Sequence, residues 1–346
     1  MLSTVSELSS RPLLASALDA ELFVDREAEL AALERSATER LNALVVGEAG
    51  VGKTSLLHQL ERRFDGHAEV EPVFVEGARR VEHPEELLSL IALRIDADRA
   101  RLAQAGELAQ AIGARSPRGA TERLLAALGS VREALAATAA RRPLLILDEL
   151  ASGAVAHALF GQLRDELWSL PATWVVAAEA GERAAYLRPP ASAFFETVIA
   201  VGPLDEADAL ELLRRRTAGA RIPRRVLREV AAAAGGNPRR VLTLARDSLL
   251  EGLDPAEAAS EHAARARLAR ELGEAASRLV AYLETNGAAS ASDERMLSEL
   301  GWGRSRATQV LRQLERAGLV DAASERSNSS RRKLYTLSDQ RERVGA

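Results

Sequence analysis

The sequence predicts an α/β fold with a parallel sheet, followed by an all-helical segment and a small third domain. Strand-length apolar runs alternate with helical apolar patterns as far as residue 203, which is the order of elements in a parallel sheet covered on both faces. A glycine-rich phosphate-loop pattern lies between the first strand and a long helix. After Gly202-Pro203 the strand patterns stop, and helical stretches follow.

The composition limits the class of protein. The 346 residues suffice for two or three domains, and 47% hydrophobic residues are ample for their cores, although only 3% are aromatic. The absence of cysteine excludes disulfides, thiolate metal sites and thiol nucleophiles. The net charge of −4 gives no overall attraction for nucleic acid, so any basic surface must be local. Residues 1–22 lack a signal-peptide core and no apolar run reaches membrane-span length, so we expect a cytoplasmic protein.

The phosphate loop is the most specific motif in the chain. Residues 47–54 read Gly-Glu-Ala-Gly-Val-Gly-Lys-Thr and fit the pattern G-x-x-x-x-G-K-[ST]. Only two of the 46 Lys and Arg residues are lysine, and one of them is Lys53. A slim ammonium reaches between the β- and γ-phosphates, whereas a planar guanidinium is too bulky for that position. The nucleotide contacts predicted here are Glu48, Ala49, Gly50, Val51, Gly52, Lys53, Thr54 and Ser55.

The flanks of the loop agree with this interpretation. An apolar strand is predicted at 41–46 and a helix at 54–63, so the backbone N–H groups between them form an anion nest at a helix N-terminus. Gly50 and Gly52 permit close approach of a phosphate, and Thr54 would offer its hydroxyl to Mg²⁺. We expect Lys53 to point into a solvated loop. The alternative is a glycine-rich turn that binds nothing.

A second strand end supplies acidic residues. Pro143 precedes an apolar run, which is typical of a buried parallel strand at 144–148, and the run ends in Asp148 and Glu149. Asp148 is the predicted Mg²⁺ ligand, and Glu149 would polarise an attacking water. Together with the phosphate loop this segment resembles a Walker B element. Taken alone, it could mark a solvated loop.

The remaining elements are predicted from apolar periodicity. Further strands are expected at 70–76, 173–178 and 196–201, and further helices between them at 84–97, 119–140 and 154–170. The all-helical segment is expected to contain helices at 205–217, 223–234, 238–250 and 255–271.

Two motifs resemble those of a known family. Residues 23–30, Phe-Val-Asp-Arg-Glu-Ala-Glu-Leu, are similar to the F-V-G-R-E-x-E-L segment of AAA+ ATPases of the origin-recognition type and of STAND signalling ATPases, with aspartate in place of the usual glycine. The resemblance implies an AAA+-like P-loop base in which Phe23, Val24 and Arg26 border the adenine. Residues 235–240, Gly-Gly-Asn-Pro-Arg-Arg, resemble the G-N-P-R element of the family's helical lid. This implies that Pro238 and Arg239 face the nucleotide and that Arg239 reaches the γ-phosphate.

One position departs from the family pattern. The family usually has Asn, Thr or Ser at the end of the fourth strand, whereas this chain has Glu179. A carboxylate beside the γ-phosphate repels it unless it is protonated or turned away, so we expect slow hydrolysis. Arg183 and Arg188 lie where an arginine finger could be offered to a neighbouring subunit. The alternative for both is a solvated surface charge.

The C-terminal segment has a pattern of its own. Helices are predicted at 272–286 and 293–300, a third starts at Ser305, and a hairpin with a polar tip at 324–330 follows. The arrangement resembles the winged helix-turn-helix of MarR-type and initiator-type DNA-binding domains. Residues 301–334 carry eight cations and three acids, a local charge of +5 in an acidic protein.

The resemblance and the local charge together select candidate DNA contacts. These are Ser305, Arg306, Thr308, Gln309 and Arg312 on the third helix, and Arg331, Arg332 and Lys333 on the wing. Polar side chains at the start of such a helix reach base edges, and cations on a wing meet phosphates. The alternative is a winged helix that packs within the protein, as in STAND switches.

These observations combine into one hypothesis. The expected parts are an N-terminal extension at 1–22, an AAA+-like P-loop ATPase base at 23–203, a helical lid at 204–271 and a winged helix-turn-helix at 272–346. They would bind ATP and Mg²⁺, hydrolyse ATP slowly and couple nucleotide state to duplex DNA. A homo-oligomer and a protein partner stay open, and no membrane partner is expected. The alternatives are a STAND-type signalling switch or assembly scaffold, and a transposition or defence ATPase.

Overall fold

The chain folds into two compact units, Pro12–Gly202 and Pro203–Ala346, of which the second also takes in the start of the chain. The computed structural model describes residues 8–96, 120–137, 141–218, 222–250, 252, 254–327 and 330–338. Among the described residues, no helix is long and apolar enough to cross a membrane. The predicted boundaries of the four parts stay predictions.

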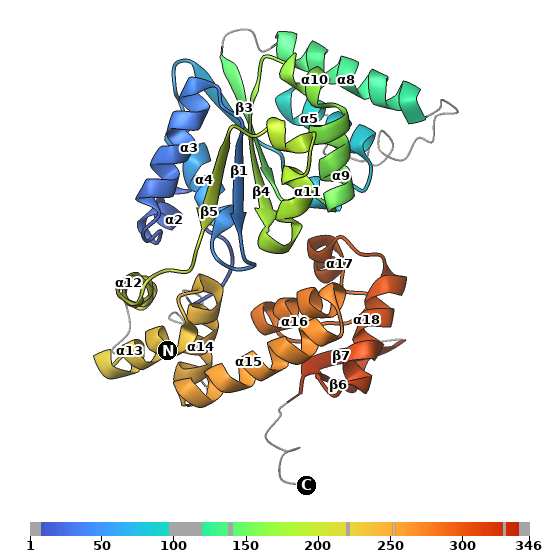
Figure 1. Cartoon of the computed structure of the whole chain (residues 1–346). Helices are drawn as coiled ribbons and strands as arrows, with labels where there is room; N and C mark the ends of the chain where they lie inside the picture. Colours follow the sequence, from blue (N-terminus) through green and yellow to red (C-terminus); the bar gives the residue numbers. More distant parts are fainter. Residues whose placement is uncertain are drawn as a thin grey trace. The chain divides into compact units, whose positions relative to one another are not determined.

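The first unit is built on a five-stranded sheet (Figure 1). Its strands are β1 (Ala43–Gly47), β2 (Val70–Phe74), β3 (Arg142–Asp148), β4 (Thr173–Glu179) and β5 (Thr197–Val201). The strand order is β2-β3-β4-β1-β5 and every pairing is parallel. Because parallel neighbours cannot be joined by a tight turn, the chain crosses the sheet through helices. The predicted α/β fold with a parallel sheet is confirmed.

Apolar side chains alternate between the two faces of the sheet. On β3, Leu144 and Ile146 pack on the side of helices α3 (Glu27–Glu39) and α4 (Lys53–Phe64), whereas Leu145 faces the opposite side. The helices on that opposite side are α5 (Pro84–Ile95), α8 (Ala120–Ala137), α9 (Gly153–His157), α10 (Arg164–Trp168) and α11 (Arg183–Leu187) (Figure 1). Both faces are therefore covered, and only the edges of the sheet are open to ligands.

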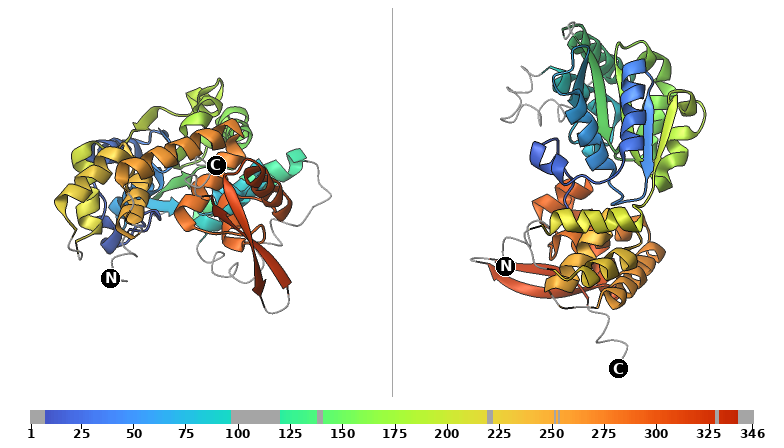
Figure 2. Two further views of the ribbon diagram at one scale, coloured as in Figure 1. Left: turned by 90° about the horizontal axis from the view of Figure 1, so that it is seen from below. Right: turned by 90° about the vertical axis from the view of Figure 1, so that its left-hand side faces the viewer.

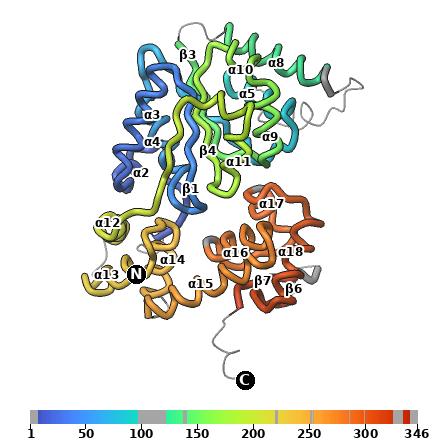
Figure 3. Tube along the Cα trace, in the orientation of Figure 1, coloured from blue at the N-terminus to red at the C-terminus, as the bar shows by residue number. Residues whose placement is uncertain are grey.

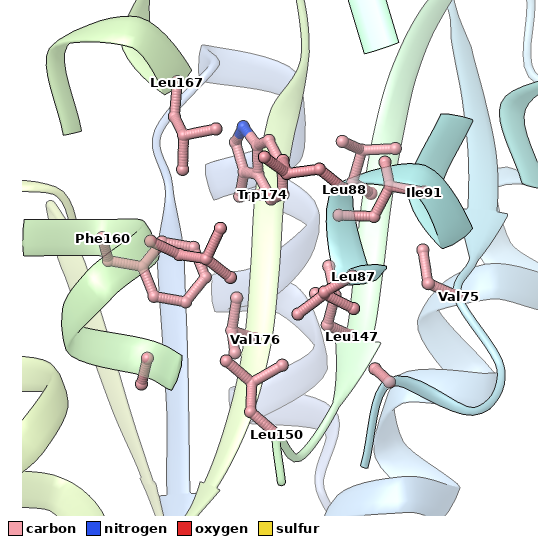
Figure 4. Close-up of a cluster of buried hydrophobic side chains, with 14 of the residues drawn as sticks. Val75, Leu87, Leu88, Ile91, Leu147, Leu150, Phe160, Leu167, Trp174 and Val176 are labelled. Atoms are coloured by element: carbon pink, nitrogen blue, oxygen red, sulfur yellow. The ribbon is translucent and has the colours of Figure 1, made fainter. Parts of the chain in front are cut away.

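Aromatic rings anchor the core on the α5 side of the sheet (Figure 4). Phe160 lies between the sheet and the helices, with its ring centroid 6.2 Å from that of Trp174 and 5.0 Å from that of Phe194. Leu147 and Val176 complete the cluster from β3 and β4. Each large side chain buried in this way contributes about 1.5–3 kcal/mol. A sequence with few aromatic residues thus places several of them where one helix layer meets the sheet.

The helix predicted at 154–170 is interrupted in the structure. Helix α9 passes into a π-helical turn at Ala158–Gln162, and Leu163, with φ −101° and ψ 17°, separates this turn from α10. Figure 3 follows this path from β3 to β4. A π turn holds one more residue than an α turn, and Leu159 and Phe160 are both fully buried there. Periodicity alone could not show this insertion, because the apolar spacing on either side remains helical.

The second unit begins with four helices and ends with three helices and a hairpin. The elements are α12 (Glu206–Arg216), α13 (Arg224–Ala234), α14 (Pro238–Leu250), α15 (Pro255–Glu271), α16 (Glu274–Asn286), α17 (Glu294–Leu300), α18 (Arg304–Arg316), β6 (Val320–Ser327) and β7 (Ser330–Leu337). Strands β6 and β7 pair antiparallel as an extended two-stranded ribbon (Figure 2). Three helices followed by a hairpin are the order of elements that is expected for a winged helix.

Aspartate side chains define where several of these helices start. Asp205, Asp254 and Asp293 each cap a helix by accepting a backbone N–H of its first turn. Asn237 does the same for α14, since its side-chain oxygen accepts the Arg240 N–H over 3.4 Å. A glycine pair, Gly235 and Gly236, precedes this cap. The Leu204 N–H donates to the Gly236 carbonyl over 2.8 Å, so the chain passes close to Gly236 as it enters the second unit.

This close approach leaves no space for a side chain at Gly236. A Cβ there would lie 2.0 Å from the Leu204 carbonyl oxygen, and the residue has φ 75°. The neighbouring Gly235 has φ 65°, but a Cβ at that position would meet no atom within 4 Å.

We therefore expect different costs for alanine at the two glycines. Gly235→Ala should lower the free energy of unfolding by about 1–2 kcal/mol, the cost of a left-handed residue with a side chain. Gly236→Ala should cost at least about 3 kcal/mol, because the backbone at Leu204 must also move. Chemical denaturation of the full chain measures both changes. Equal losses in the two variants would contradict the close approach at Leu204.

Candidate functional site

The carboxyl ends of four strands meet at one edge of the sheet. Gly47 at the end of β1 pairs with Glu179 of β4 and with Val201 of β5, and Asp148 of β3 pairs with Ala177. This edge is where open parallel sheets bind ligands. The register alone therefore brings the phosphate loop, the Asp148 carboxylate and the Glu179 carboxylate to the same side of the unit.

The phosphate loop connects β1 to α4 as predicted. Gly50 and Gly52 have φ angles of 78° and 105°, and α4 begins at Lys53 with Gly52 as its N-cap. Glu48 and Ala49 are exposed. The Ser55 hydroxyl, one position beyond the motif, accepts the backbone N–H of Leu13 over 3.0 Å. Ser55 therefore attaches the start of this unit to the phosphate-loop helix.

Lys53 is buried, which differs from the solvated position expected from the sequence. The residue is 4% exposed, and its Nζ donates to the carbonyl oxygens of Gly47 over 3.0 Å and of Glu48 over 3.1 Å. A carboxylate oxygen of Glu149 lies 3.2 Å away. The side chain folds back across its own loop because a buried ammonium needs several acceptors.

Thr54 and Asp148, far apart in sequence, are joined by a hydrogen bond. The Thr54 hydroxyl donates to Asp148 Oδ2 over 2.8 Å, while Asp148 Oδ1 is buried and has no hydrogen-bond partner among the described residues. Burial, and next the Glu149 carboxylate, raise the pKa of Asp148 above its ordinary value against the opposing Arg79, Thr54 and Lys53. A hard cation accepts such oxygen ligands. The pair therefore fits the predicted Mg²⁺ site.

The described residues supply few ligands beyond this pair. No cluster of three His, Asp or Glu side chains suited to a metal occurs among them. Mg²⁺ commonly binds through one or two protein ligands and completes its octahedron with waters and substrate phosphates. The site thus suits a cation that arrives with a nucleotide.

Glu149 has two cationic partners, one of which the sequence did not reveal. Its Oε1 lies 3.2 Å from Lys53 Nζ, and its Oε2 accepts a hydrogen bond from Arg79. Arg79 belongs to a 3₁₀ turn at Ala78–Arg80, beyond the end of β2. Glu149 also has φ 56°, an unusual backbone conformation for a residue with a side chain. The carboxylate predicted to polarise water is therefore tied to two cations in this structure.

Glu179 ends β4, and the two predicted arginine fingers, Arg183 and Arg188, lie at the two ends of α11. Glu179 is half-buried at the end of β4, in register with the first residue of the phosphate loop. Arg183 starts α11 and Arg188 follows its end, and both are exposed. Whether either acts on a neighbouring subunit stays a prediction.

The segment predicted to border the adenine forms the turn that leads into α3. Asp25 and Arg26 have φ angles of 58° and 74°, so the position where the resemblance expects glycine is indeed left-handed. Arg26 is buried and donates to the Gly202 carbonyl and to Glu29. Val24 is buried and Phe23 half-buried. Arg26 thereby ties the end of β5 to α3, and contact with a base stays a prediction.

Pro238 and Arg239 belong to the second unit. Pro238 is the first residue of α14, and Arg239 is half-buried there, with its carbonyl accepting the Thr243 hydroxyl over 3.0 Å. Proline suits this position because the first turn of a helix needs no donor. The role of Arg239 toward a γ-phosphate stays a prediction.

Helix α18 presents most of the predicted DNA contacts to solvent. Ser305, Arg306, Gln309 and Arg312 are exposed, and Val310, Leu311 and Leu314 are buried on the other side. Thr308 differs, because it is half-buried and its hydroxyl donates to the Arg304 carbonyl over 2.8 Å. Its hydroxyl is already used within the helix, so it is a weaker candidate for base contact than expected.

The wing is only partly available to phosphate. Lys333 Nζ lies 2.8 Å and 3.0 Å from the two carboxylate oxygens of Glu315, and this hydrogen bond raises the pKa of Lys333. Its charge is therefore paired within the protein, which the sequence did not indicate. Arg331 and Arg332 lie on β7, and their side chains are outside the described part of the structure.

Comparison with known proteins finds a family model that matches part of the first unit. Residues 22–176 match the AAA ATPase domain family, which confirms the resemblance to AAA+ ATPases. No curated protein matches the chain significantly.

Solved structures show the same fold over nearly the whole chain. The Aeropyrum pernix ORC1 protein, solved in complex with DNA, has a TM-score of 0.51 at 21% identity, covering 93% of this chain and 91% of that protein. The Walker-type ATPase of Pyrococcus abyssi has a TM-score of 0.50 at 18% identity, covering 96% and 97%.

Proposed function

We propose that this chain binds ATP with Mg²⁺, hydrolyses ATP slowly and couples its nucleotide state to duplex DNA. The match of residues 22–176 to the AAA ATPase domain family supports the proposal. The observation that carries the proposal is the convergence of Lys53, Thr54, Asp148 and Glu149 at one edge of the sheet. Phosphate binding, metal binding and water activation each need one of these groups.

The phosphate loop supplies the binding of the triphosphate. Its backbone N–H groups and the N-terminus of α4 attract the phosphate oxygens, and Lys53 meets the β- and γ-phosphates once it leaves Glu149. Thr54 and Asp148 would hold Mg²⁺, which neutralises phosphate charge when bound. The 2.8 Å hydrogen bond between them holds both oxygens at the same place.

Two carboxylates are the reason for proposing that hydrolysis is slow. Glu149 is held by Lys53 and Arg79, so it must be released before it can accept a proton from water. Glu179 adds a negative charge at the end of β4, beside the loop that receives the phosphates. Arg183 and Arg188 are exposed and available to a neighbouring subunit, where an arginine finger would counter this charge.

Helix α18 is the proposed DNA-reading element. Arg304, Arg306, Arg312 and Arg316 are all exposed, and no described carboxylate forms an ion pair with any of them. Arg306 lies 5.3 Å from the ring centroid of the buried Trp302, which fixes the start of the helix. Exposed cations that have no carboxylate partner among the described residues are suited to phosphate contacts. The solved complex of the similarly folded ORC1 protein with DNA agrees with this use.

Hydrogen bonds from arginines join the helical segment to the C-terminal domain. Arg246 on α14 donates to the Glu284 carbonyl on α16 over 2.7 Å. The buried Arg265 on α15 donates to the Ser338 carbonyl after β7 over 3.3 Å and lies 3.8 Å from the Glu284 carboxylate. A movement of α14 or α15 would therefore be transmitted to α16 and to the hairpin. We propose this contact as the route from nucleotide state to DNA contact.

The first prediction concerns nucleotide binding. Lys53→Ala should weaken ATP affinity at least about a hundredfold, because the loop loses its only side-chain cation toward the phosphates. Lys333→Ala removes the other lysine of the chain and should leave the affinity unchanged. Calorimetric titration with Mg·ATP measures both. An Lys53→Ala variant that folds and binds ATP like the parent would exclude the phosphate loop as the site.

The second prediction concerns hydrolysis. Glu149→Gln should retain ATP and lose turnover, because an amide cannot accept the proton of the attacking water. Arg79→Gln should raise kcat several-fold, since it releases one oxygen of Glu149. Arg80→Gln alters the exposed neighbour in the same turn and serves as the control. Phosphate release at saturating ATP measures kcat. Unchanged turnover in Arg79→Gln would show that Arg79 does not restrain Glu149.

The third prediction concerns DNA. The double variant Arg306→Glu/Arg312→Glu should weaken duplex binding at every sequence and flatten its salt dependence. Gln309→Ala should alter sequence preference instead, at about 1–3 kcal/mol for a lost base contact. Arg224→Glu/Arg228→Glu reverses two exposed charges on α13 and controls for net charge. If the α18 variant binds DNA like the parent, the protein-contact switch becomes the better description of the C-terminal domain.

A further inference from the structure

Charged side chains gather where helices α14, α15 and α16 lie side by side (Figure 1). Three acids, three arginines and one histidine make up this charged cluster, namely Asp247, Glu261, Glu284, Arg240, Arg246, Arg265 and His262. Those that form ion pairs have side chains no more than 25% exposed. Because a buried charge is costly unless it is paired and hydrogen-bonded, each of these groups needs partners.

Most of the charged cluster is paired. The His262 Nε2 atom lies 3.2 Å from Asp247 Oδ2, which connects α15 to α14. The Arg265 guanidinium donates to Glu261 Oε1 over 3.0 Å and to the Ser338 carbonyl over 3.3 Å. A single arginine on α15 therefore also holds the residue that follows β7, at the end of the C-terminal hairpin.

Glu284 on α16 is the acid of the cluster that has a carboxyl oxygen without a hydrogen bond. Its Oε1 atom is buried, has no hydrogen-bond partner among the described residues and lies 3.8 Å from Arg265 Nη1. Its backbone carbonyl, by contrast, accepts Arg246 Nη2 over 2.7 Å. Because a buried ionised carboxylate normally accepts several hydrogen bonds, this geometry fits a protonated, neutral carboxyl group.

The electrostatic surroundings of Glu284 agree with this geometry. Burial raises the pKa of Glu284 above its ordinary value and Asp247 of α14 raises it further, whereas His262 and Arg265 of α15 and Arg240 of α14 oppose the rise. The folded chain therefore binds this proton more tightly than the unfolded chain does. The stability that the proton contributes is complete below the ordinary glutamate pKa, and it is lost as the pH rises through the raised pKa of Glu284.

We propose that the proton on Glu284 acts as a switch that holds the end of the C-terminal hairpin to α15. With the proton in place, Arg265 keeps its hydrogen bonds to Glu261 and to the Ser338 carbonyl. As the pH rises, the carboxyl group releases its proton to water, and the new negative charge draws Arg265 across the 3.8 Å that separates them. Ser338 then loses its contact with α15, and the hairpin end loosens. The switch does not depend on nucleotide or DNA binding by this chain.

Hydrogen exchange of the full chain, measured by mass spectrometry on residues 334–338, tests the proposal. The Ser338 N–H donates to the Leu319 carbonyl over 3.0 Å, so slow exchange there reports a closed hairpin end. After correction for the intrinsic exchange rate, protection in the parent should fall between about pH 5 and about pH 8 as Glu284 ionises. Glu284→Gln imitates the protonated group, so at the alkaline end its protection should exceed that of the parent about three- to tenfold, as expected for one retained hydrogen bond.

Glu261→Gln makes the same substitution in the other acid that faces Arg265 and serves as the matched control. Glu261 already accepts a hydrogen bond from Arg265, so this variant should not raise protection at the alkaline end and should keep the pH dependence of the parent. The proposal would be overturned if Glu284→Gln followed the parent at every pH, or if both glutamine variants raised protection equally. Protection in the parent that stays constant over this pH range would overturn it as well.

Discussion

Parallel pairing of β1 with β4 and β5, and of β3 with β4, determines where chemistry can occur in the first unit. Helices cover both faces of the sheet, so its strands expose functional groups only at their ends. One edge collects Gly47, Asp148 and Glu179, and the other collects Arg142 and Thr173. A single register therefore places the phosphate loop and the Asp148 and Glu179 carboxylates at one edge of the sheet, away from Arg142 and Thr173 at the other.

Lys53 and Glu149 compensate each other's charge at the phosphate loop, which links nucleotide binding to the proposed catalysis. Lys53 is buried and needs acceptors, which it finds in two carbonyls of its own loop and in Glu149. The phosphates of a nucleotide would replace these acceptors. Glu149 would then keep its contact with Arg79. The carboxylate that pairs with Lys53 is thus the group proposed to activate water, and under this proposal substrate binding would change the contacts of Glu149.

Some arginines of the second unit join its elements through hydrogen bonds, and others are exposed charges on its surface. Arg240, Arg246 and Arg265 donate to backbone carbonyls on other elements of the unit. A guanidinium has several donors in a fixed plane, so one side chain can bind a carbonyl and a carboxylate together. Exposed arginines on α18 lack such partners in the described structure. The same residue type therefore rigidifies the helices and leaves one helix free to contact a phosphate backbone.

The sequence alone was enough to predict the fold class, the phosphate loop and the strand that ends in Asp148 and Glu149. Each of these depends on residues that are neighbours in the chain. Gly50, Gly52 and Lys53 act within one turn, and the apolar run before Asp148 is a strand by its own composition. Only the tertiary structure showed that Lys53 is buried, that Arg79 holds Glu149, and that Glu315 neutralises Lys333. Arg79 and Glu149 are 70 positions apart, and no periodicity links them. Side-chain burial depends on packing between distant segments, which the order of residues does not state.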